Sequence, residues 1–241
     1  MEDYKLQPEP SGPPVLQRTD VHAERLYPQR ISDFVIDSET HIHNILEQAV
    51  HNTENINVLV KSLLPFQRAI LSNGMEQADI SGICRVYEIV LSRQDEIDQI
   101  LLDTLDFHLI ERHIQLTAEH YSRVQCSVRT CILRLWISWI STERTLPETC
   151  DVVILGCIIR WKSLSLEERL LTSVIYLANM INWDGSEEEI MEFFEMARNN
   201  FRGTEWEKLM CQAVGPDPFN YFMENTIDAE EEEEFLEEED G

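Results

Sequence analysis

The chain has 241 residues and a net charge of −26, which comes from 45 acidic and 19 basic residues. This charge repels the phosphates of nucleic acids and anionic lipids, so we expect no nucleic acid and no membrane among the partners. Hydrophobic residues make up 43% of the chain, enough for one folded domain of ordinary size. No apolar run reaches the roughly 20 residues of a membrane helix, and the polar N-terminus does not resemble a secretory signal. We therefore expect a soluble intracellular protein, nuclear or cytoplasmic.

The two ends of the chain differ in composition from its middle. Residues 1–30 contain five prolines and few apolar residues. Because proline fixes φ and removes a backbone donor, this composition predicts a disordered arm. Residues 224–241 hold 11 acidic residues, whose mutual repulsion predicts a disordered acidic tail. Phe235 and Leu236 interrupt these acids, and they either anchor the tail in a partner's groove or belong to a plain solubilising tail.

Between the ends, apolar residues recur with the helical period, which predicts an all-α helical bundle. We assign residues 31–125 to a region of long helices. One helix is expected around Ile42, a second from Ile83 to Leu101, and a third from Ile110 to Leu135. Apolar spacings that alternate between four and three residues predict helices that pack lengthwise along a neighbour. The chain is expected to turn between the second and third helices at Asp103 to Asp106.

Shorter helices are expected after residue 125. Ser165 with Glu168, Ser186 with Glu189, and Thr204 with Glu207 each fit the capping box that begins a helix. The run Val152–Ile159 is apolar on every side, and its period also suits a buried strand. We expect a helix there, because its neighbours are helical and a lone strand has nothing to pair with. The expected helices span about 126–141, 148–162, 166–181, 187–201 and 205–214, and Gly215–Pro218 is expected to end the last one.

Patterns that carry chemistry are absent from the sequence. There is no Cys-x-x-Cys or Glu-x-x-His pair for a metal, no Gly-x-Ser-x-Gly elbow and no phosphate-binding glycine loop. We therefore expect no catalytic residue, no metal site and no cofactor, and the protein is not expected to be an enzyme. The six cysteines lie in apolar helical segments and are expected to be small buried hydrophobic residues.

Five short segments resemble the consecutive helices of one family. The segments are Val128–Leu133 with Trp136, Ile158–Leu164, Leu170–Asn179, Trp206–Met210 and Pro216–Phe219. In this order residues 126–223 resemble a cyclin box, in which five helices surround a buried third helix. The Tyr-Leu-Ala-Asn sequence that ends at Asn179 is closest to the atypical kinase activators of the Speedy/RINGO type. The resemblance implies a cyclin-box-like unit after the long helices.

The resemblance also implies a function, namely a non-enzymatic regulator that binds and activates or targets a cyclin-dependent kinase. The lysine by which cyclins hold their kinase falls on Met180, and the matching glutamate falls on Glu207. Ordinary core packing is the alternative interpretation for the apolar residues among those expected to bind the partner. The expected partner-binding residues are Leu177, Met180, Ile181, Ile190, Phe194 and Glu207, together with Phe235 and Leu236 in the tail.

A second function fits the same sequence. The chain is then a helical adaptor or scaffold subunit of a multiprotein complex, and its acidic tail binds basic partners such as histones. Neither interpretation implies a particular oligomeric state.

Overall fold

The computed structural model describes residues 55–64, 67, 77–182 and 185–226. In these ranges the protein is all-helical and has no strand, as the sequence predicts. The helix expected around Ile42, the proline-containing arm, and Phe235 with Leu236 lie outside the described residues.

The helices follow one another with short connections. The α-helices are α2 (Ile56–Leu63), α4 (Gln77–Ser92), α5 (Gln99–Thr104), α6 (Phe107–His120), α7 (Cys126–Ile140), α8 (Glu148–Ile159), α9 (Leu166–Asn182), α10 (Glu187–Asn200), α11 (Trp206–Val214) and α12 (Pro216–Asn225). The short 3-10 turns are η2 (Gln94–Glu96), η3 (Tyr121–Arg123) and η4 (Trp161–Ser163). The five helices expected after residue 125 are α7 to α11, and each of their ends lies within three residues of the expected position.

The helix expected from Ile83 to Leu101 is wrong, because it is divided in two. Helix α4 ends at Ser92, and η2 leads through the extended residue Ile97 to α5. The Arg93 guanidinium binds the Glu96 carboxylate across η2, with 2.8 Å between Nε and Oε1. Ile97 is buried although it lies in a turn, so the helical spacing of apolar residues continues across the break.

The helix expected from Ile110 to Leu135 is wrong for the same reason. After α6 the chain forms η3 and then the extended residues Val124 and Gln125, and only then begins α7. The Arg129 guanidinium donates a hydrogen bond to the carbonyl of Val124 at 3.0 Å, which fixes the corner. The turn expected at Asp103 to Asp106 is confirmed, since α5 ends at Thr104 and α6 begins at Phe107.

The starts of the short helices follow from their caps. Ser165 and Glu168 form the full capping box, because each side chain accepts a hydrogen bond from the other residue's backbone N–H, at 3.0 and 3.2 Å. The Ser186 hydroxyl accepts from the Glu189 N–H at 3.2 Å. At the third site the expectation was wrong in detail. The Thr204 hydroxyl accepts from Trp206 N–H, so this threonine lies one residue before the cap of α11.

Helix α12 was not expected from the sequence. Gly215–Pro218 does end α11, but the same residues begin another helix. Gly215 has φ of 84° and ψ of 164°, and Pro216 takes the first helical position, where its missing N–H costs no hydrogen bond. The helix continues to Asn225, so the position where we expected the acidic tail to begin lies inside α12.

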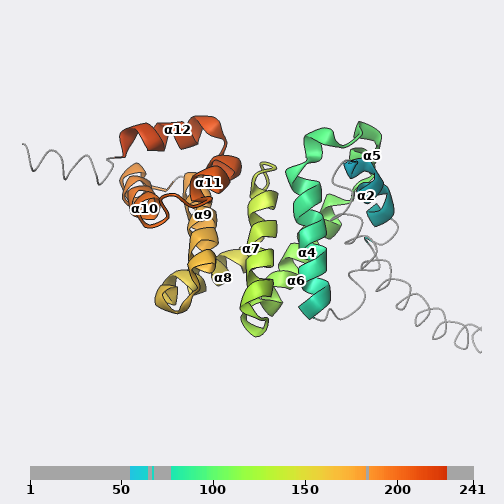
Figure 1. Ribbon diagram of the computed structural model, residues 1–241, viewed down its shortest axis with the longest axis horizontal. Coiled ribbons are helices and arrows are strands. Elements are labelled where there is room, and N and C mark those ends of the chain that lie inside the picture. The colour runs from blue at the N-terminus through green and yellow to red at the C-terminus, as the bar shows by residue number, and fades with distance from the viewer. Residues whose placement is uncertain (1–54, 65–66, 68–76, 183–184, 227–241) are drawn as a thin grey trace, which may run out of the picture.

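The helices are arranged in two layers. Helices α4, α7, α9 and α11 form a row in which each packs on the next, and Figure 1 shows α7 between α4 and α9. Helix α6 packs on α8 in the second layer. Helices α2 and α5 lie at one end of the row, and α10 and α12 lie at the other. Figure 1 shows α4 and α7 side by side along their lengths, which is the packing expected for the helical segments before residue 135.

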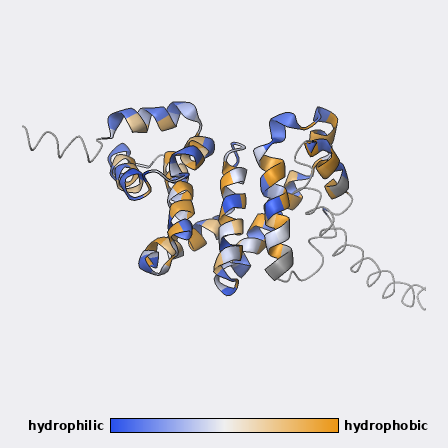
Figure 2. Ribbon diagram, viewed as in Figure 1, coloured by the Kyte–Doolittle hydropathy of each residue, from blue (hydrophilic) through white to orange (hydrophobic). Residues whose placement is uncertain are grey.

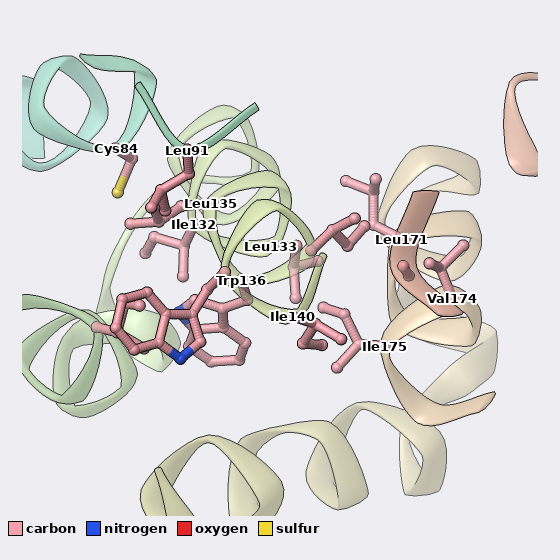
Figure 3. Close-up of a cluster of buried hydrophobic side chains, with 14 of the residues drawn as sticks. Cys84, Leu91, Ile132, Leu133, Leu135, Trp136, Ile140, Leu171, Val174 and Ile175 are labelled. Atoms are coloured by element: carbon pink, nitrogen blue, oxygen red, sulfur yellow. The ribbon is translucent and has the colours of Figure 1, made fainter. Parts of the chain in front are cut away.

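One hydrophobic core runs through the described helices. Its buried side chains extend from Ile56 in α2 to Phe222 in α12. Figure 3 shows Cys84 and Leu91 of α4 on one side of α7, and Leu171 of α9 on the other side. In Figure 2 the central helix α9 is largely orange, while blue and orange residues alternate along the outer helix α12. The helices before residue 125 and those after it, which we assigned to two regions, therefore share one hydrophobic core.

Candidate functional site

A pocket of about 380 Å³ opens between α8, α9 and the start of α10. The described residues that line it are Asp151, Ile154, Leu155, Tyr176, Asn179, Met180, Gly185 and Glu189. Of the sequence-predicted binding residues, Met180 lies in this wall. The pocket is mostly apolar, and two carboxylates stand at its edge.

Helix α8 forms one wall of the pocket and exposes an apolar face beside it. Ile154 and Cys157 point into the core and are buried. Val152, Leu155 and Ile159 follow at i, i+3 and i+7 on the opposite face, where they are 71, 54 and 84% exposed. Contiguous exposed apolar surface of this kind marks sites of protein interaction. We call these three residues the α8 outer face.

The loop before α10 brings the second wall close to α9. The Gly185 N–H donates to the Met180 carbonyl at 3.0 Å, directly after α9 ends. A side chain at Gly185 would meet that same carbonyl oxygen at 3.0 Å and the Ile190 side chain at 3.3 Å, so only glycine fits without a shift. The Tyr176 and Phe193 rings pack with centroids 4.9 Å apart, which holds α9 against α10.

The polar side chains that line the pocket are two acids, one amide and the phenol of Tyr176. Asp151 Oδ1 accepts a hydrogen bond from Asn179 Nδ2 at 3.0 Å, which joins α8 to α9. Partial burial raises the pKa of Asp151, and the nearby Glu148 carboxylate raises it further. Glu189 is exposed in the first turn of α10. Among the described residues that line the pocket none is basic, so the site favours a cation.

The other sequence-predicted residues are distributed differently. Leu177, Ile190 and Phe194 are between 0 and 5% exposed. These three side chains pack in the core and are not accessible at the surface in this structure. Ile181 is half-buried, and Glu207 is exposed in the first turn of α11.

Sequence reasoning missed the α8 outer face as a candidate site. The run Val152–Ile159 did carry the signal, because a helix that is apolar on all sides must expose one side unless it is fully surrounded. We predicted a helix for that run without assigning an exposed face to it, and only α6 and α9 pack extensively against α8 among the described helices.

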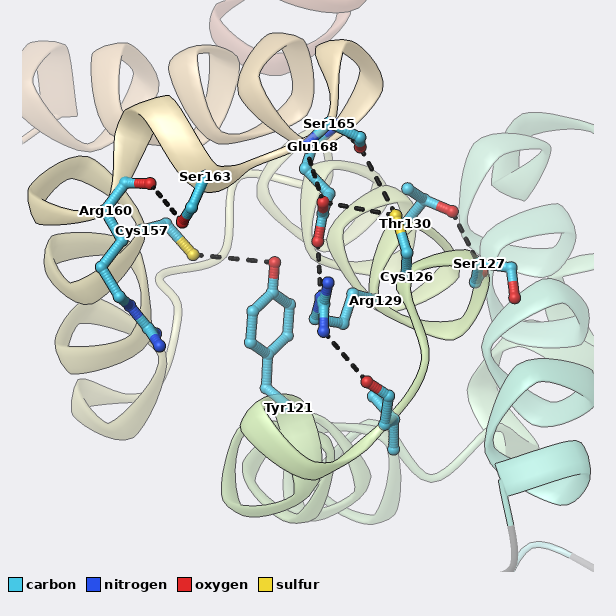
Figure 4. A network of polar contacts seen from close by, with 11 residues as sticks. Tyr121, Cys126, Ser127, Arg129, Thr130, Cys157, Arg160, Ser163, Ser165 and Glu168 are labelled. Carbon is cyan, nitrogen blue, oxygen red and sulfur yellow. Dashed lines mark hydrogen bonds and ion pairs between the residues drawn. The ribbon is translucent and has the colours of Figure 1, made fainter.

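A polar network joins α7 to the start of α9, as Figure 4 shows. Arg129 Nε donates to Glu168 Oε1 at 2.5 Å, and the Cys126 thiol donates to Glu168 Oε2 at 3.3 Å. Burial would raise the pKa of Glu168, but the hydrogen bonds from Arg129 and Ser165 outweigh it, and the pKa is lowered. The network thus holds a charged carboxylate that is 1% exposed.

The cysteines are less uniform than the sequence predicts. Cys84, Cys131, Cys150 and Cys157 are buried as expected. Burial raises the pKa of the Cys150 thiol to about 12, which makes it unreactive at neutral pH. Cys126 is exposed, contrary to expectation, because it lies in the first turn of α7 and bonds to Glu168 and not to the core.

The described residues contain neither a metal site nor a membrane-spanning helix. No group of three or more histidine, cysteine or acidic side chains in these ranges could hold a metal ion. None of the helices in the described part of the chain has the length and apolar character to cross a membrane. His113, which shares a face of α6 with His120, is fully buried.

Comparison with known proteins finds no family model, no curated protein and no solved structure that matches this chain.

Proposed function

We propose that the protein is non-enzymatic and regulates another protein by binding it through α8, α9 and the start of α10. The α8 outer face carries this proposal, because it leaves three large apolar side chains between 54 and 84% exposed beside a pocket. Burial of one such side chain gains about 1.5 to 3 kcal/mol, so a partner that covers the face is favoured over water. The chain's acidic surface adds attraction for basic partners.

A cyclin-dependent kinase is the first candidate partner. Its support is that α9 packs against α7, α8, α10 and α11, so the third of five helices is enclosed by the other four. A cyclin box has this arrangement, and residues 126–223 resemble one in sequence. Binding would stabilise the ordered state of the kinase, which is a conformational effect that needs no catalytic residue. Glu207 is exposed and Met180 lies in the pocket wall, so both are accessible to a kinase.

The test is a pull-down of purified cyclin-dependent kinases by the tagged full chain, followed by a kinase assay on a substrate peptide. We expect one kinase to be retained and its activity to rise. Glu189→Gln removes an exposed charge at the pocket and should weaken binding about tenfold. Glu119→Gln removes an exposed charge from α6 and should leave binding unchanged. The kinase candidate is wrong if no kinase binds while the chain remains folded.

An adaptor or scaffold is the second candidate. The row α4, α7, α9 and α11, with α6 on α8 in a second layer, favours it. Helix rows in two layers occur in α-solenoids, which offer extended surfaces to several proteins. In this candidate the acidic tail recruits basic partners such as histones.

The tail is tested by deleting residues 227–241, which leaves α12 intact. Histone binding should weaken strongly, and the salt dependence of the remaining binding should be smaller. If the truncated chain binds histones as tightly as the full chain, the tail has no such role.

A further inference from the structure

We infer that the pocket and the α8 outer face form one docking groove, and that its occupant is an amphipathic helix of a partner protein with lysine or arginine along one edge. This inference rests on the proposed function, because it specifies the kind of segment that the same surface binds. We call the surface the α8 groove.

The apolar part of the groove fits a helix in length and depth. Val152 and Ile159 are seven residues apart on α8, which places them about 10 Å from each other along the helix axis. A partner helix presents its anchors at i, i+3 or i+4 and i+7 over the same distance. The pocket beside Leu155 has a volume of about 380 Å³, near the lower end for ligand pockets. A pocket of this volume holds one or two large side chains of a partner helix.

The charged residues of the groove determine which end of it a basic residue of the partner helix occupies. Asp151 lies on the pocket side of α8, Glu189 stands opposite on α10, and Glu148 is exposed one turn before Val152. The charge that raises the pKa of Asp151 is another acid, the Glu148 carboxylate. A lysine or arginine at this end of the groove would relieve that repulsion and form a charge-assisted hydrogen bond. Arg160 lies at the other end, where its Nε donates to the Gly156 carbonyl at 3.1 Å.

The same charges exclude two other occupants. The tail pair Phe235 and Leu236 is surrounded by acidic residues, and these would be repelled by Asp151 and Glu189. A second copy of the chain is also disfavoured, since each copy carries a net charge of −26. A basic segment of another protein is the occupant that the charge favours.

The experiment titrates the full chain with three labelled peptides of about 18 residues, long enough to form a helix. All three have the same leucine face, and their polar faces are lysine, glutamine or glutamate. Fluorescence anisotropy should give the affinity order lysine, then glutamine, then glutamate, with about tenfold between the first two. Leu155→Ser should weaken the lysine and glutamine peptides about tenfold each, whereas Asp151→Asn should weaken the lysine peptide alone.

Two matched variants distinguish peptide binding in the α8 groove from non-specific attraction of the peptide to the acidic surface. Ile100→Ser removes an apolar side chain that is 81% exposed on α5, and Glu119→Gln removes an exposed acid on α6. Both should bind the lysine peptide as the unchanged protein does. The inference is overturned if Ile100→Ser weakens binding as much as Leu155→Ser. It is also overturned if the chain dimerises in sedimentation and Leu155→Ser abolishes the dimer.

The kinase pull-down separates this inference from the proposed function. If a kinase binds the chain and none of the peptides does, the inference that a basic amphipathic helix occupies the α8 groove is wrong. The proposed function is then still in place. Peptides that bind with the expected order, without any kinase, would support the groove and remove the kinase as partner.

Discussion

His113 offers the sharpest test of the core, because its imidazole ring is fully buried. The residue lies on α6, is 0% exposed, and has its ring 5.5 Å from the Tyr87 ring. Neither ring nitrogen has a hydrogen-bond partner within the described ranges. The perturbation is His113→Leu, which keeps a side chain of similar volume and removes both nitrogens.

Burial lowers the pKa of His113 from 6.5 to about 4. As the pH falls through this window, the unfolded chain binds a proton that the folded protein does not bind, so the free energy of unfolding decreases. The decrease is about 2 kcal/mol between pH 7 and pH 5, and about 3 kcal/mol by pH 4. At pH 7 the neutral ring still loses its hydration on burial, so the leucine variant should be at least as stable as the unchanged protein.

The assay is urea unfolding followed by tryptophan fluorescence at pH 7 and pH 5. Carboxylates titrate alike in both proteins, so the difference between variant and unchanged protein isolates His113. We expect this difference to grow by about 2 kcal/mol in favour of the variant from pH 7 to pH 5. The control is Ile114→Val, which changes a buried residue of the same helix that carries no titratable group and should show no such growth. A difference for His113→Leu that stays constant with pH would refute a buried neutral imidazole.

Three further substitutions test the local structure by urea unfolding at pH 7. Glu168→Ala removes the carboxylate that caps α9 and binds α7, and should cost about 2 to 3 kcal/mol, whereas Glu167→Ala on the surface should cost under about 1 kcal/mol. Gly215→Ala places a residue with a side chain at a φ of 84° between α11 and α12, which should lower the free energy of unfolding by about 1 to 3 kcal/mol. An unchanged free energy of unfolding would contradict this backbone conformation. Ser173→Ala leaves the buried Trp206 indole N–H without its acceptor at 2.9 Å and should cost about 1 to 2 kcal/mol; no change would mean that another acceptor replaces it.

The periodicity of apolar residues predicted where helices lie better than where they break. The capping residues Ser165 and Ser186 act locally through hydrogen bonds to the next turn, so the starts of α9 and α10 were readable from the sequence. The breaks at η2 and η3 depend on tertiary packing, because Ile97 and Tyr121 are buried in turns. A buried turn and a buried helix leave the same apolar pattern in the sequence.

The candidate site was harder to predict, because it depends on what is absent around a helix. The apolar run Val152–Ile159 has the composition of a buried element, and only the packing shows that the described helices cover α8 on one side. Met180 was found through the resemblance to cyclins, and it does line the pocket. Leu177 and Phe194 came from the same resemblance, but they point inward from α9 and α10 and are buried. A helix's face toward a partner and its face toward the core are equally apolar in sequence.

Hydrogen–deuterium exchange of the full chain, with and without the leucine–lysine peptide, tests most directly whether α8, α9 and α10 form a protein-binding surface. We predict slower exchange in α8, in the second half of α9 and in the first turn of α10, and unchanged exchange in α4, α5 and α6. Leu155→Ser should remove the protection. Protection centred on α4 to α6, or no protection at saturating peptide, would contradict the account.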